Sequence, residues 1–145
     1  MKIPFNKPDL ISREFEYIQD AISHGHVSGD GIYTKKCTSL LEVELDVKKV
    51  LLTTSCTHAL EMAAILLDIQ SGDEIIVPSF TFVSTVNAFV LRGAKPVFID
   101  IRLDTLNMDE NKLEELITEK TKAIIPVHYA GVGCEMDKIM NIANK

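Results

Sequence analysis

The sequence predicts an α/β fold in which a mostly parallel sheet is flanked by helices. From residue 50 onward, short apolar segments rich in β-branched residues alternate four times with segments whose apolar residues recur at helical spacing. Such alternation favours right-handed crossovers and parallel pairing of successive strands. With 145 residues, 46% of them hydrophobic, the chain has the length and composition of one globular domain.

Two helices are expected before the sheet begins. Residues 1–9 contain two prolines and should form an extended arm. Ser12 should cap a first helix that Gly25 ends, and Thr34 should cap a second helix. The glycine-containing loop at residues 26–31 suits either a close approach to a ligand or a plain connection.

Apolar runs and turn residues set the expected bounds of the sheet and its helices. The last predicted helix is not followed by a further strand that would cover the sheet edge, so the chain is interpreted as the front part of a larger α/β domain. Strands are expected from residue 50, at 74–78, at 96–100 and at 122–127, with helices from residue 55 to about 71, over 80–91, after Asp109 and over 136–143.

The turn at Ser55, Cys56 and Thr57 is the first candidate for a functional site. It follows a predicted strand and opens a helix, where backbone N–H groups lack internal partners and carry the positive end of the helix dipole. Such an entrance binds phosphate groups. Because Ser and Thr are also common N-cap residues, an ordinary helix cap explains the same pattern.

Further polar and aromatic residues follow the other predicted strands. They lie at 79–82, at Asp100 and at 128–129, where the carboxyl ends of parallel strands meet. Ligands of open α/β sheets bind outside these ends, and a flat phosphorylated heterocycle would suit the residues present. The sequence contains no GxGxxG, GxxxxGK[ST] or GxSxG motif, and no pair of carboxylates stands out as general acid and base.

Composition argues against several classes of function. The net charge of −6 argues against nucleic-acid binding, and no apolar run approaches the ~18 residues of a membrane span. Cys37, Cys56 and Cys134 are widely spaced without a CxxC pair, which suits a reducing compartment, so the cytoplasm is expected. His24 and His26 lack a third ligand at suitable spacing, so no metal site is predicted.

Five segments resemble the motifs of one enzyme family: residues 3–8, 26–31, 54–60, 78–85 and 126–131. Over essentially its whole length, the chain is similar to the sugar-nucleotide aminotransferases of pyridoxal-phosphate fold type I, the DegT/DnrJ/EryC1/StrS type. The family's usual phosphate turn reads Ser-Gly-Thr-x-Ala-Leu. Here Cys56 stands where Gly is commonest, and it retains the backbone N–H.

The resemblance implies roles for individual residues. The turn at the helix entrance would hold the phosphate of pyridoxal 5′-phosphate, and Phe82 would stack on its pyridine ring. From the sequence pattern alone, Phe82 could equally be a core residue of its helix. The residues implied are Ser55, Cys56, Thr57 and Phe82 for the cofactor, and Phe5, Ser28 and Gly29 for the sugar nucleotide.

The resemblance also implies how the whole enzyme works. Residues 1–145 would be the N-terminal portion of the cofactor-binding large domain, and the Schiff-base lysine would lie beyond Lys145, so this chain alone would be inactive. The parent would transfer an amino group from glutamate to a dTDP-4-keto-6-deoxyhexose, in the synthesis of surface polysaccharide such as enterobacterial common antigen. It would be a cytoplasmic homodimer or higher oligomer.

Two alternatives differ in class from this interpretation. One is a non-catalytic α/β module that binds a phosphorylated ligand or a protein partner with the same crevice or with its sheet edge. The other is a different fold-type-I branch, such as a cysteine desulfurase, whose phosphate turn is similar. The proline-containing arm and the loop at Ser28 and Gly29 argue against that branch.

Overall fold

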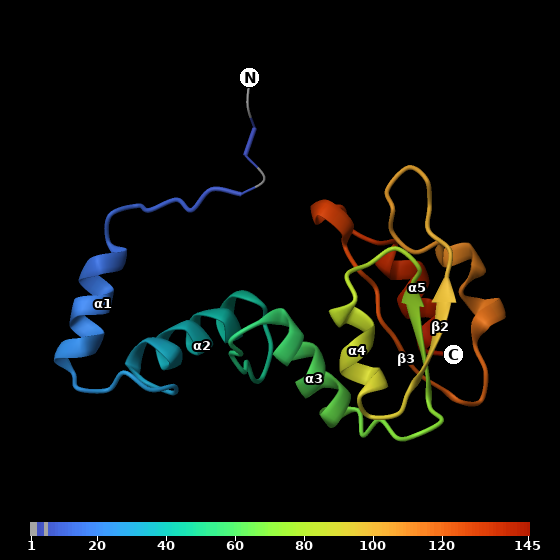
Figure 1. Ribbon diagram of the computed structural model, residues 1–145, viewed down its shortest axis with the longest axis horizontal. Coiled ribbons are helices and arrows are strands. Elements are labelled where there is room, and N and C mark those ends of the chain that lie inside the picture. Colours follow the sequence, from blue (N-terminus) through green and yellow to red (C-terminus); the bar gives the residue numbers. More distant parts are fainter. Residues whose placement is uncertain (1–2, 5) are drawn as a thin grey trace. The chain divides into compact units, whose positions relative to one another are not determined.

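The computed structural model describes residues 3–4 and 6–145, so Phe5, one of the residues implied for substrate binding, lies outside the described residues (Figure 1). The chain divides into two compact units, Met1–Leu52 and Thr53–Lys145. The first unit is helical, and the second contains the sheet. No helix within the described ranges combines the length and the hydropathy that crossing a bilayer requires.

The first unit contains helices α1 (Glu14–Ser23) and α2 (Ile32–Glu44). Gly25 follows α1 with a φ of 69°, and its N–H bonds to the carbonyl oxygen of Ile22, which confirms it as the stop residue. The predicted caps are wrong. Ser12 lies before the N-cap of α1 in a positive-φ conformation, and α2 begins two residues before Thr34.

Residues 50–54 do not form the buried strand that their apolar pattern predicts. They have no strand assignment, and Leu51 and Leu52 are 57% and 46% exposed. A strand forms by pairing with a neighbouring strand. Among the described residues, only the three strands of the second unit pair with one another. The apolar pattern shows that these residues suit a strand but cannot supply the partner.

The sheet consists of β1 (Glu74–Pro78), β2 (Lys95–Ile99) and β3 (Thr121–Ile124), in the order β2-β1-β3. Both pairings are parallel, as predicted. The central strand β1 is buried along its whole length, because it has a neighbour on each edge and packed elements on each face. Its apolar run therefore shows no alternation with polar residues.

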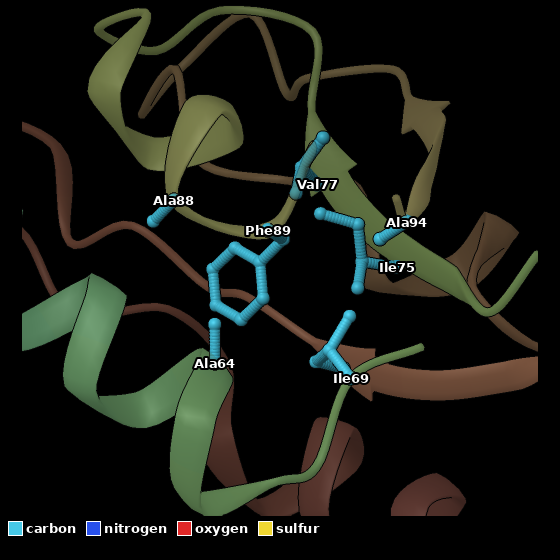
Figure 2. Packing of buried hydrophobic residues seen from close by; sticks show 7 residues of the cluster. All are labelled: Ala64, Ile69, Ile75, Val77, Ala88, Phe89 and Ala94. Atoms are coloured by element: carbon cyan, nitrogen blue, oxygen red, sulfur yellow. The ribbon is translucent and has the colours of Figure 1, made fainter. Parts of the chain in front are cut away.

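Successive side chains of β1 point to opposite faces and so contribute to two hydrophobic clusters. Ile75 and Val77 join α3 (Cys56–Leu66) and α4 (Ser84–Val90), where Phe89 lies among the cluster's side chains (Figure 2). Ile76 joins the cluster that includes Ile139 of α5 (Met136–Ala143). Helices thus cover both faces of a parallel sheet, which confirms the predicted α/β class.

Two predicted helices differ from the structure: one begins later than expected, and the helix expected after Asp109 does not form. Helix α4 begins at Ser84 instead of near residue 80, because the Ser79 N–H bonds to the Ile99 carbonyl oxygen at 2.8 Å and continues the sheet pairing. After Asp109 the chain forms two 3₁₀ turns, η1 (Glu110–Lys112) and η2 (Glu114–Leu116), and no α-helix. The Asp109 side chain nevertheless caps the first turn, as predicted.

Candidate functional site

The N-terminus of α3 is built by a chain of local hydrogen bonds. Ser55 is the N-cap: its backbone is extended, and its side-chain oxygen accepts the His58 N–H at 3.1 Å. The Thr53 hydroxyl donates to the Ser55 carbonyl oxygen at 2.8 Å, and that same carbonyl accepts the first helical bond, from Ala59. The ordinary-cap interpretation is therefore confirmed for Ser55, whose O–H can still act as a donor.

Two backbone N–H groups remain at this helix end. Cys56 and Thr57 are the first two residues of α3, and within the described part of the chain neither N–H has a protein acceptor. The Thr57 hydroxyl likewise makes no hydrogen bond there. Ser55 and Cys56 are exposed and Thr57 is half-buried. Two amides and two hydroxyl donors thus remain for an anion at the positive end of an eleven-residue helix.

Both α3 and α4 begin on the side of the sheet to which the strand arrows point (Figure 1). Helix α3 leads into the amino end of β1, and α4 returns from the carboxyl end of β1 to the amino end of β2. The turn that opens α3 therefore lies at the edge where ligands of open α/β sheets bind.

Phe82 lies in the segment between β1 and α4, and its side chain is 74% exposed. The core interpretation of Phe82 is therefore wrong, because Phe89 fills the hydrophobic cluster of this helix instead (Figure 2). An exposed aromatic ring at the carboxyl edge of the sheet is available to a planar ligand. Stacking on a pyridine ring stays a prediction.

An aromatic pair connects the segments that follow β1 and β3. The rings of Phe80 and Tyr129 lie 5.0 Å apart between centroids, tilted by 51°. The sequence places both residues after predicted strands but gives no sign that they touch. Their contact confirms that residues 79–82 and 128–129 converge at one edge.

Asp100, just after β2, forms an exposed ion pair with Lys112. Its carboxylate accepts a hydrogen bond from Lys112 Nζ at 2.8 Å, and this bond lowers the Asp100 pKa. The same contact raises the pKa of Lys112. His128 uses its Nδ1 to accept the Cys134 N–H at 3.0 Å, which orients the ring within its own loop.

Ser28 and Gly29 belong to the first unit and not to the unit that carries the turn at the start of α3. Their loop is exposed and is organised around His26 Nε2, which lies 3.0 Å from the Gly29 carbonyl oxygen and 3.3 Å from the Ser28 hydroxyl. Their role in substrate binding stays a prediction. Across the described ranges, no three His, Cys, Asp or Glu side chains gather as metal ligands would.

Comparison with known proteins gives a match to one aminotransferase family. Residues 8–145 match the DegT/DnrJ/EryC1/StrS aminotransferase family. GDP-perosamine synthase of Escherichia coli O157:H7 is 36% identical over 141 residues, which are 97% of this chain and 39% of that protein. The chain thus spans about two fifths of the length of this curated relative.

Solved structures give the same result. Spr1654 of Streptococcus pneumoniae, assigned as a sugar aminotransferase, is 36% identical with a TM-score of 0.87 over 98% of this chain and 36% of its own, and is known in pyridoxal- and pyridoxamine-phosphate forms. GDP-4-keto-6-deoxy-D-mannose-3-dehydratase of E. coli, with bound hydrated pyridoxal phosphate, is 26% identical with a TM-score of 0.89 over 99% of this chain and 38% of its own.

Proposed function

Because the chain belongs to the DegT/DnrJ/EryC1/StrS aminotransferase family, we propose that it forms the part of an aminotransferase that holds the phosphate and one ring face of pyridoxal 5′-phosphate. The observation that supports this most strongly is the pair of N–H groups of Cys56 and Thr57, which have no protein acceptor in the described part of the chain. They lie beside the hydroxyls of Ser55 and Thr57, at the sheet edge where ligands of open α/β sheets bind.

The residues present fit this group chemically. A phosphate dianion needs several donors and a positive field, and the α3 N-terminus provides amides, hydroxyls and the helix dipole together. The exposed Phe82 ring supplies an apolar face for a planar heterocycle. When bound, pyridoxal phosphate supplies the electron sink for amino-group transfer. The residues of this chain bind and orient the cofactor.

For the whole enzyme we propose the reaction of a dTDP-4-amino-4,6-dideoxygalactose transaminase. Glutamate would donate an amino group to the C4 ketone of a dTDP-4-keto-6-deoxyhexose, for surface polysaccharides such as enterobacterial common antigen. The segments at Phe5 and at Ser28 and Gly29 would contact the sugar nucleotide, and the enzyme would act as a cytoplasmic homodimer or higher oligomer. Two of the similar proteins carry GDP sugars in their names, so competition between dTDP- and GDP-linked 4-keto sugars tests the nucleotide.

We propose further that residues 1–145 form the N-terminal portion of the large domain and do not transfer amino groups alone. A catalytic lysine must be desolvated and deprotonated near neutral pH. Lys112, beside the carboxyl end of β2, is instead held protonated by Asp100, which raises its pKa. Lys95 begins β2 at the opposite edge.

The experiment that tests the cofactor role is equilibrium titration of the chain with pyridoxal phosphate and with pyridoxal. Binding through the α3 N-terminus requires the phosphate, so we expect saturable binding of pyridoxal phosphate and a large loss of affinity for pyridoxal. Equal affinity for the two compounds would contradict the phosphate site. Equal affinity for pyridoxal phosphate and an unrelated phosphate ester would instead favour the non-catalytic binding module.

A reductive trapping experiment tests whether the chain is inactive alone. After incubation with pyridoxal phosphate and glutamate, borohydride reduction should label several lysines at less than one equivalent in total, without formation of 2-oxoglutarate. Lysine side chains that are solvated and not activated by their surroundings react slowly and without selectivity. Stoichiometric labelling of one lysine together with turnover would contradict this part of the proposal.

A further inference from the structure

Asn107 is a buried polar residue whose side-chain amide forms hydrogen bonds to a single segment of the chain. It is 3% exposed. Its Oδ1 accepts the Tyr129 N–H at 2.9 Å, and its Nδ2 donates to the carbonyl oxygens of Val132 and Gly133, both at 3.0 Å. A buried amide with all three bonds directed to one segment determines where that segment lies.

Asn107 is itself held in place by its surroundings. The chain turns back at residues 102–106, so that Ile101 and Met108 form an antiparallel bridge and the Arg102 N–H bonds to the Asn107 carbonyl oxygen at 2.8 Å. Met108 is 1% exposed in the hydrophobic cluster that α5 covers. The buried Glu110 carboxylate adds a tie to α5 through Lys138 Nζ at 3.0 Å. The side-chain amide therefore projects from a rigid support.

The segment that receives these bonds has little other support. Residues 130–133 are exposed, and Ala130 has a φ of 51°, which a residue with a Cβ adopts only when its surroundings impose it. The remaining bonds of this turn are short-range, such as those from Gly131 to His128 and from Val132 to Tyr129. They shape the turn but do not attach it to the rest of the unit.

We propose that Asn107 is a positioning residue of the candidate site. By fixing residues 129–133, it directs the Tyr129 ring against Phe80 and so forms an aromatic wall at the carboxyl edge of the sheet, where the cofactor ring would lie. The effect on the ligand rests on the proposed function. The effect on the contact between the two rings does not.

The sharpest test is Asn107→Asp, which preserves the volume of the side chain. The variant keeps an acceptor for the Tyr129 N–H but turns an oxygen toward the carbonyl oxygens of Val132 and Gly133, so the turn must move. We expect the nuclear Overhauser contacts between the Phe80 and Tyr129 rings to disappear, while those of Phe89 within its cluster remain. The dissociation constant for pyridoxal phosphate should rise about two- to tenfold. If the buried carboxylate prevents folding, Asn107→Ala gives the same test without a charge.

Two variants control for changes that are merely structural. Asn111→Ala removes an amide of the same segment that bonds only to Asp109 and Glu110. Ile69→Val weakens the other hydrophobic cluster, which includes neither Asn107 nor Met108. Both should keep the contacts between Phe80 and Tyr129 and the cofactor affinity.

The proposal is overturned if Asn107→Asp keeps the ring contacts, if Ile69→Val loses them as well, or if the contacts disappear in Asn107→Asp while the affinity stays unchanged. If the unmodified chain does not bind pyridoxal phosphate, the proposed function fails, and the ring contacts alone decide the role of Asn107.

Discussion

Replacing Phe82 and Phe89 separately by alanine should divide cofactor binding from folding. The two rings lie seven positions apart, in and just before the same short helix, but in opposite environments. Phe82 is 74% exposed, whereas Phe89 is 1% exposed within the first hydrophobic cluster (Figure 2). The same chemical change at the two positions should therefore have different consequences.

The structure gives the expected size of each effect. Complete burial of a phenylalanine side chain stabilises a fold by ~1.5–3 kcal/mol, so a ring that is about one quarter buried contributes less than ~1 kcal/mol. Phe89→Ala also leaves a cavity and should reduce the free energy of unfolding by ~3–5 kcal/mol. Loss of aromatic stacking, worth ~0.5–1.5 kcal/mol, should weaken cofactor binding by Phe82→Ala about two- to twelvefold.

Urea unfolding followed by circular dichroism measures the first quantity, and titration with pyridoxal phosphate measures the second. We expect Phe82→Ala to unfold close to the unmodified chain and to bind the cofactor more weakly. A loss of several kcal/mol in Phe82→Ala with unchanged cofactor affinity would refute the assignment. Phe89→Ala, measured where it remains folded, should keep most of its affinity.

Three further changes have defined outcomes. Thr57→Val should weaken pyridoxal phosphate binding by ~1.5–3 kcal/mol in titration, because it removes a hydroxyl from a charged ligand; unchanged affinity would leave Thr57 as a helix residue only. Gly93→Ala should cost more stability in thermal unfolding than Gly72→Ala, because both have φ above 90° but only at Gly93 would a Cβ lie 2.9 Å from Ser71 Cα. Burial raises the pKa of Glu110, but Lys138, the backbone and Arg102 outweigh it and hold that pKa below its usual range. The ionised Glu110 carboxylate therefore stabilises the fold at neutral pH, and this contribution is lost as the pH falls through the lowered pKa. In Glu110→Gln, the free energy of unfolding should therefore decrease less between neutral and acidic pH than in the unmodified chain.

Some features that depend on neighbouring residues were predicted from the sequence, although the helix caps expected at Ser12 and Thr34 were wrong. The hydroxyl turn that opens α3 and the glycine that ends α1 were both identified correctly. Each depends on residues within a few positions of one another. The strand expected from residue 50 failed for the opposite reason, because strand formation depends on a partner that a local pattern does not contain.

Much of the candidate site likewise depends on contacts between distant segments. The exposure of Phe82 and the contact between Phe80 and Tyr129 depend on where distant segments meet, and the sequence left the place of Phe82 open between core and surface. Asn107 was not identified at all. Its partners lie 22 to 26 residues away, and an asparagine near a turn has no local signal that separates a turn residue from a buried anchor.

The measurement that tests the central claim most directly is an amide chemical-shift titration of the ¹⁵N-labelled chain with pyridoxal phosphate, with pyridoxal as the control. If the cofactor phosphate binds at the α3 N-terminus, the N–H groups of Cys56 and Thr57 should show the largest shifts, saturating together, with pyridoxal phosphate only. Unmoved Cys56 and Thr57 amides at saturating cofactor, or equal shifts with pyridoxal, would contradict the assignment of this turn as the phosphate site.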